Sequence, residues 1–100
     1  MVSISDIKDA HERISGHIHR TPILSSRTIN NITGADVLFK CENLQKTGSF
    51  KIRGATNTVE QLPASKLSKG IVTVSSGNHG AALSVAGSRK DVPVTVIMPS

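Results

Sequence analysis

The chain has 100 residues, which suits one small domain, and a net charge of +5 at pH 7 from 12 Lys and Arg against 7 Asp and Glu. The basic residues are scattered and the two aromatics, Phe39 and Phe50, do not interleave with them, which argues against nucleic-acid binding. No apolar run approaches a membrane span and Met1–Asp6 lacks a signal-peptide pattern, so we expect a cytoplasmic protein that binds neither nucleic acid nor membrane.

The first predicted element is an amphipathic helix. The residues of its expected apolar face recur at three- and four-residue steps, at Ile4, Ile7, His11, Ile14 and Ile18. Ser3, with Asp6 three residues later, is the candidate N-cap. The helix should end before Thr21-Pro22, because proline disfavours a helical residue in front of it.

A strand and a second helix follow. Val37–Cys41 reads as the strand, and its single cysteine is expected to be a buried, inert thiol in a reducing compartment. The helix buries one face and ends at Pro63. Its expected core residues are Ile52, Ala55, Val59 and Leu62.

The last third of the chain alternates between strand and helix patterns. After a polar stretch at 63–69 that holds at most one short helical turn, Ile71–Val74 reads as a buried strand. A helix of small residues is expected at Ala81–Ala86 and a further strand at Val94–Met98. The alternation predicts an α/β fold, with a parallel sheet flanked by helices.

Lys51 lies where a turn meets the start of the second helix, in the segment KTGSFKIRGA (46–55). Apolar neighbours and the positive end of the helix would favour its neutral amine, which can attack a carbonyl and form a Schiff base. The alternative is a capped helix start with a surface lysine.

A second motif, SSGNHG at Ser75–Gly80, joins a predicted strand to a predicted helix. Backbone N–H groups in such a turn can bind an anion at the edge of a parallel sheet. The alternative is a purely structural turn. The chain contains no phosphate-binding loop and no G-x-G-x-x-G, and its histidines lack the partners of a metal site, so no metal site is predicted.

Together, SFKIRGA and SSGNHG resemble the fold-type II pyridoxal-phosphate enzymes, in the branch of the serine racemases and serine/threonine dehydratases. Three flanking segments appear in the matching order, namely RTPILSS (20–26), LFKCENLQKTGS (38–49) and VIMP (96–99). The resemblance implies a fragment of the tryptophan synthase β-like fold. It covers about Ile4 to Pro99 and implies that residues 1–100 are the N-terminal portion of a larger two-domain enzyme, with an N-terminal helix and part of the small α/β domain.

The resemblance also implies roles for residues of both motifs. Lys51 would be the Schiff-base lysine, Phe50 would pack on the ring of pyridoxal 5'-phosphate or simply fill the core, and Asn78 would bind the phenolic oxygen of that cofactor. The substrate carboxylate would be held by the turn that carries Ser75, Ser76, Gly77, Asn78 and His79, in which His79 binds substrate or only orients the loop.

Ser76 is the residue that could distinguish racemisation from elimination. Racemisation needs an acid or base on each face of a planar carbanion, so a hydroxyl at Ser76 could serve the face opposite Lys51. The resemblance therefore implies a serine racemase with dehydratase activity on serine or threonine, or an L-threonine/L-serine ammonia-lyase alone. The SSGNHG turn argues against a β-replacement synthase of the same fold. A non-catalytic regulatory fragment and an RNA-binding module that uses the GNHG loop are further alternatives.

Other implied features are a homodimer, and Mg²⁺ or Ca²⁺ bound by residues beyond Ser100. Candidate nucleotide contacts are Ser26, Lys46 and Thr47. Arg27 and Ala81 depart from the mammalian-type racemase pattern, which puts nucleotide regulation in doubt.

Overall fold

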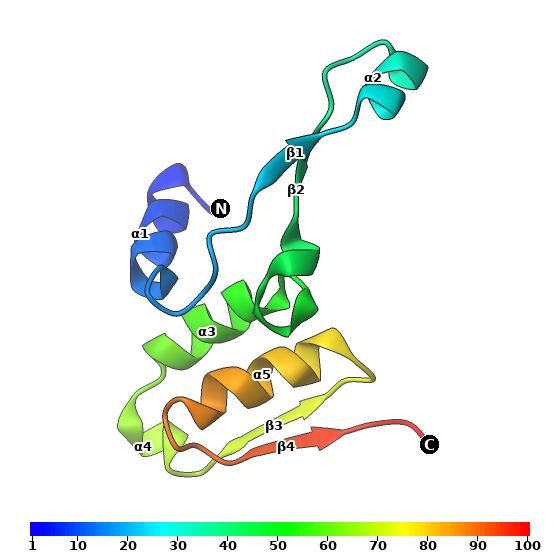
Figure 1. Ribbon diagram of the computed structural model, residues 1–100. Coiled ribbons are helices and arrows are strands. Elements are labelled where there is room, and N and C mark those ends of the chain that lie inside the picture. Colours follow the sequence, from blue (N-terminus) through cyan, green and yellow to red (C-terminus); the bar gives the residue numbers. More distant parts are fainter.

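The computed structural model describes residues 1–100 as stacked layers with one projecting arm (Figure 1). Helix α3 packs on α5, α5 covers one face of the β3–β4 sheet, and α1 packs on the other side of α3. The bounds of the helices and strands are α1 Ile4–Ile14, β1 Ile23–Ser25, α2 Arg27–Thr33, β2 Leu38–Lys40, α3 Lys51–Gln61, α4 Ala64–Leu67, β3 Ile71–Val74, α5 Asn78–Ser88 and β4 Val94–Ile97. Two 3₁₀ turns, η1 Glu42–Leu44 and η2 Lys46–Gly48, precede α3.

Helix α1 begins as predicted but buries less than predicted. Ser3 and Asp6 form a reciprocal capping box, in which each residue's side chain accepts a hydrogen bond from the other's backbone N–H. The helix ends at Ile14, well before Pro22, and Ile14 is its only buried residue. The predicted amphipathic helix is confirmed, but its apolar face is not covered over the first turns, where Ile4 and Ile7 are 71% and 56% exposed.

The projecting arm is the main departure from the predicted layer. The predicted strand Val37–Cys41 forms as Leu38–Lys40, but it pairs antiparallel with Ile23–Ser25 in a separate two-stranded ribbon and does not join the parallel sheet. Neither β1 nor α2 was predicted from the sequence. Cys41 lies outside the strand and is half-buried, so the expectation of a buried thiol is also wrong.

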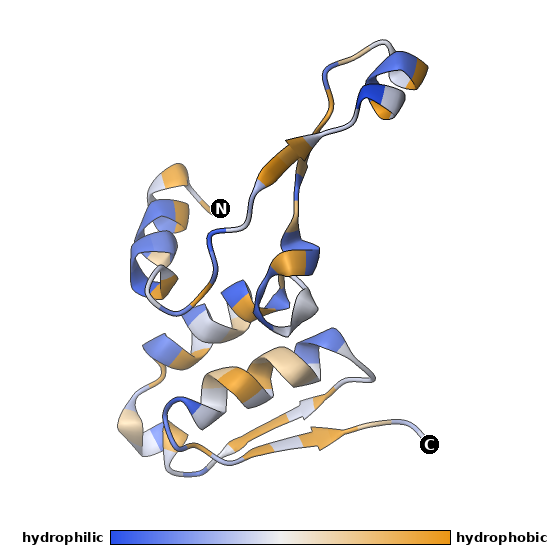
Figure 2. Cartoon of the chain, in the orientation of Figure 1, coloured by the Kyte–Doolittle hydropathy of each residue, from blue (hydrophilic) through white to orange (hydrophobic).

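The core forms where α3 meets α5. Its six buried members are Ile52, Ala55, Val59, Ala82, Leu83 and Ala86. Leu62 is only half-buried at the end of α3, and Pro63 ends that helix and precedes the short α4, as predicted. The small side chains of α5 allow this close packing, and Figure 2 shows their apolar character beside that of the strands.

Strands β3 and β4 pair in parallel, with Ile71 opposite Val94 and Val74 opposite Ile97. The side chains of β3 alternate between half-buried and exposed, so the expectation of a buried strand holds for one face only. The other face carries Val72 and Val74, which are 68% and 73% exposed. None of the helices is long and apolar enough to cross a bilayer.

Candidate functional site

Lys51 is the first residue of α3, at the junction that the sequence predicted. The turn before it uses two left-handed residues, Thr47 at φ 66° and Gly48 at φ 72°. The Ser49 hydroxyl then accepts a hydrogen bond from the backbone N–H of Lys51 at 3.4 Å. A local turn and its hydroxyl partner thus set where α3 begins and where this lysine lies.

The Lys51 ammonium lies over an aromatic ring rather than beside a carboxylate. Its Nζ is 5.1 Å from the centroid of the Phe50 ring, within cation–π range. None of the chain's ion pairs includes Lys51. Both residues are exposed, so the residues of this chain do not supply the desolvation expected around the amine.

Both sequence motifs contribute to one cavity of about 550 Å³, the second of them through His79 alone. Phe50 and Lys51 line it from the start of α3, and His79 lines it from the first turn of α5. Strand β3 contributes Ile71–Thr73 to the same wall. Residues nearly thirty positions apart therefore face a common space, because α3 and α5 pack with their N-terminal ends close to each other.

The turn Ser75–Gly80 joins β3 to α5, as predicted. The Ser75 hydroxyl accepts hydrogen bonds from the backbone N–H groups of Gly77 at 3.2 Å and Gly80 at 3.0 Å. These bonds engage Ser75 in holding the turn. Ser76 and Asn78, by contrast, are exposed and make no side-chain hydrogen bond within the chain.

An ion pair next to the site was missed in the sequence. Arg53 donates through Nε and Nη2 to the two carboxylate oxygens of Glu42, at 2.9 and 2.7 Å. The Thr21 hydroxyl donates to the same carboxylate at 2.6 Å. The Arg53 hydrogen bond is the main cause that lowers the pKa of Glu42 to about 2. No spacing rule links 42 to 53, so only the tertiary structure reveals this pair.

Gln45 was missed for the same reason. Its side-chain oxygen accepts from the backbone N–H of His19 at 2.8 Å, and its amide donates to the His19 carbonyl at 2.8 Å. The side-chain oxygen also accepts from the Lys46 N–H at 2.9 Å. This buried side chain therefore ties the segment after α1 to the turn that leads into Lys51.

The three candidate nucleotide residues are not brought together within the chain. Ser26 caps α2 beyond the far end of the ribbon, where its hydroxyl accepts from the Ile29 N–H at 3.3 Å. Lys46 and Thr47 lie in η2, at the opposite end of that ribbon (Figure 1). The Thr47 hydroxyl is buried and has no hydrogen-bond partner.

Comparison with known proteins places these observations in one family. The family model described as "Pyridoxal-phosphate dependent enzyme" matches residues 14–100. Serine racemase from Dictyostelium discoideum is 55% identical over 98% of this chain and 30% of its own length. The beta-hydroxyaspartate dehydratase of Paracoccus denitrificans is 51% identical over 94% of the chain and 29% of its own length.

The fold comparison agrees. The solved structure of maize serine racemase superposes with a TM-score of 0.92 at 44% identity, covering 98% of this chain and 31% of that one. The chain thus spans just under a third of the length of the relatives it matches. The match confirms the α/β class and the kinship with serine racemases expected from the two motifs.

Proposed function

Because the chain belongs to the pyridoxal-phosphate dependent enzymes, we propose that it is the N-terminal portion of a two-domain serine racemase that also eliminates water from serine and threonine. The main support is the cavity that Phe50 and Lys51 line from α3 and that His79 lines from the Ser75–Gly80 segment. A lysine without a carboxylate partner lies there beside a polar turn that follows a parallel strand, where α/β proteins commonly bind ligands.

The chemistry of Lys51 and Phe50, which line this cavity, and of Asn78, which precedes the lining residue His79, fits the cofactor of the family. Lys51 offers a primary amine, Phe50 an exposed aromatic ring, and Asn78 an unengaged amide at the start of α5. These three would hold pyridoxal phosphate by a covalent bond, a ring contact and a hydrogen bond. When bound, the cofactor supplies an electron sink for negative charge at the substrate α-carbon.

The residues of the chain would bind the substrate and move its protons. The substrate carboxylate would lie against the Ser75–Gly80 turn, at the positive end of α5. The Lys51 amine would remove the α-proton from one face, and the Ser76 hydroxyl would return a proton to the other. Ser76 suits this role better than Ser75, because the Ser75 hydroxyl is already bonded to two backbone N–H groups.

Two neighbouring activities are the alternatives. Elimination needs Lys51 but no group on the second face, so an L-threonine/L-serine ammonia-lyase would use the same site. The 51% identity to a beta-hydroxyaspartate dehydratase favours testing hydroxyaspartate as a substrate as well. An RNA-binding role for Gly77–Gly80 is disfavoured, since this loop follows a strand instead of joining two helices.

The proposal extends to features that the resemblance alone supports. The full-length enzyme would be a cytoplasmic homodimer. A Mg²⁺ or Ca²⁺ ion would be bound by residues beyond Ser100. Within residues 1–100, no group of three or more His, Cys, Asp or Glu side chains is placed to hold a metal.

The test is to measure D-serine and pyruvate formation from L-serine with full-length wild type and Ser76→Ala. Ser76→Ala removes the hydroxyl that would donate a proton on the face opposite Lys51, so the rate of racemisation should fall by about two to four orders of magnitude. Dehydration of L-serine should survive much better. Ser76→Thr, which keeps a hydroxyl, is the matched control and should retain more racemisation than Ser76→Ala.

Two results would contradict the proposed roles. Equal losses of racemisation and L-serine dehydration in Ser76→Ala would mean that Ser76 only shapes the turn. If the wild type dehydrated serine without measurable racemisation, the chain would belong to an ammonia-lyase and not to a racemase. L-threonine and 3-hydroxyaspartate belong in the same substrate panel, so that a preference for either is detected directly.

A further inference from the structure

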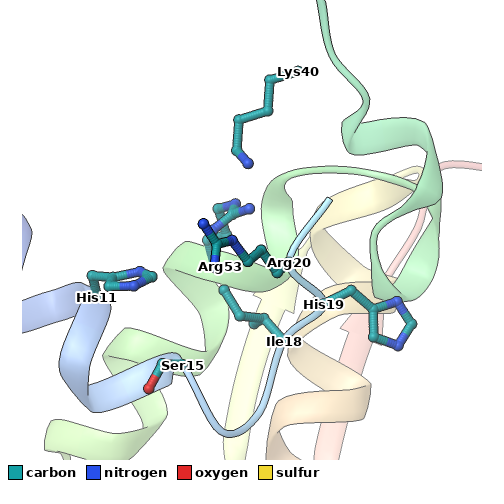
Figure 3. Close-up of a pocket in the computed structure, with 7 residues that line it drawn as sticks. All are labelled: His11, Ser15, Ile18, His19, Arg20, Lys40 and Arg53. Atoms are coloured by element: carbon teal, nitrogen blue, oxygen red, sulfur yellow. The ribbon is translucent and has the colours of Figure 1, made fainter. Parts of the chain in front are cut away.

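A second cavity, of about 540 Å³, lies between α1, the segment that follows it, the end of β2 and α3 (Figure 3). It is distinct in chemistry from the cavity beside Lys51, because its wall is basic. The wall includes His11, His19, Arg20, Lys40 and Arg53, and Ile18 is its only apolar member.

The cationic groups converge on this space. In Figure 3 the charged ends of Arg20, Lys40 and Arg53 lie toward one another, the His11 ring faces them, and the His19 ring points away. The Arg53 Nη2 and the Lys40 Nζ lie 2.7 and 3.8 Å from the same oxygen of Glu42, so these two cations are close neighbours.

The charges of this cluster do not balance within the chain. Glu42 is the one carboxylate that pairs with the cluster, and it is engaged mainly by Arg53 through two hydrogen bonds. Lys40 is held only loosely, and Arg20 forms no ion pair. Three permanent cations therefore face one carboxylate, which leaves an excess of positive charge in a concave site that concentrates anions.

Packing does not explain why Arg20 and Lys40 are there. Arg20 is exposed and the Lys40 side chain is 49% exposed, so neither fills the core. Unconstrained like charges lower their energy by moving apart into solvent, whereas these groups face one cavity. A multiply charged oxyanion in the cavity would relieve that repulsion.

We propose that this cavity binds the phosphate group of a small ligand, at a site separate from that of the reaction. The guanidinium of Arg20 matches the geometry of phosphate oxygens, and Lys40 adds a mobile point charge. Arg53 uses Nε and Nη2 for Glu42, which leaves its Nη1 free to donate. The cavity volume has room for more of the ligand than the phosphate alone.

The test uses full-length enzyme loaded with its cofactor and inorganic phosphate as the probe, followed by isothermal titration calorimetry at constant ionic strength. Wild type should bind phosphate saturably. Arg20→Gln and Lys40→Gln should each weaken binding by about tenfold or more, since each removes a charged donor. Lys66→Gln, a neutralisation of the same kind in the exposed α4, is the control and should stay within about twofold.

Arg53 is left unchanged because it also lines the cavity beside Lys51. Absorbance of the bound cofactor in each variant shows that the enzyme is folded and loaded, which separates this test from failure of the proposed reaction. Absence of saturable phosphate binding by the wild type, or binding by both variants that is as tight as that of the wild type, would overturn the inference. Equally tight binding of succinate would overturn the choice of phosphate in favour of a carboxylate ligand.

Discussion

Replacing Gly87 by alanine tests how α5 is packed on the sheet. A Cβ at Gly87 would overlap Val94 Cγ2 and lie 3.1 Å from the backbone oxygen of Val92. That backbone cannot move away freely, because the Val92 N–H donates to the Gly87 carbonyl at 3.0 Å. The helix would have to lift off β4, which opens the core around Ala82 and Ala86.

The magnitude is a difference between two opposing effects. Overpacking of a tight core costs about 1–3 kcal/mol, and more when backbone is the obstacle. Alanine in place of glycine inside a helix gains about 1 kcal/mol. We therefore expect Gly87→Ala to lower the free energy of unfolding by up to about 2 kcal/mol.

Gly54→Ala is the matched control. It makes the same chemical change inside α3, but a Cβ at Gly54 meets nothing within 4 Å. Only the gain in helix propensity remains, so this variant should be more stable than the wild type by about 0.5–1 kcal/mol.

The assay is urea denaturation of the full-length protein, combined with hydrogen exchange of the β3 and β4 amides. Exchange reports on this layer directly, which matters because a two-domain enzyme need not unfold in one step. Gly87→Ala should speed exchange in both strands, and Gly54→Ala should not. If the two variants proved equally stable, the close approach of α5 to β4 would not restrict residue 87.

Two further predictions concern charged residues. Lys51→Ala should abolish turnover and covalent attachment of the cofactor, and borohydride reduction followed by mass spectrometry should map the adduct to Lys51, whereas an adduct on another lysine would refute this. The pKa of Glu42 is about 2 in the folded chain, against about 4.3 for an unpaired glutamate. Its stabilising effect should therefore be complete above pH 4.3 and decline as the pH falls toward 2. Above pH 4.3 the free energy of unfolding of the wild type should exceed that of Glu42→Gln by about 1–2 kcal/mol, and most of this difference should disappear as the pH falls from 4.3 toward 2. A difference between the two proteins that does not change with pH would contradict this.

Local patterns determined much of this molecule. Ser3 and Asp6 could be read as a cap because both hydrogen bonds span three residues. Pro63 ends α3 through its own ring, and the β-branched run Ile71–Val74 forms a strand with the predicted bounds. The start of α3 at Lys51 likewise depends only on the turn just before it.

Tertiary structure alone decided which segments meet. The strand pattern near Val37 was visible, but its antiparallel partner Ile23–Ser25 is a three-residue segment without a periodic signal of its own. The exposure of Ile4 and Ile7 could not be predicted from the sequence. An amphipathic pattern shows which face of a helix could be buried, but not how much of that face is covered by another element.

The same limit applies to the site. Its two motifs could be found in the sequence, and the roles of Lys51 and Ser76 remain predictions. The shared cavity, the Glu42–Arg53 pair and the convergence of Arg20 with Lys40 depend on contacts between residues 11 to 33 positions apart. Short-range stereochemistry sets the helices, strands and turns, whereas the side chains that share a cavity are set by the packing of whole elements.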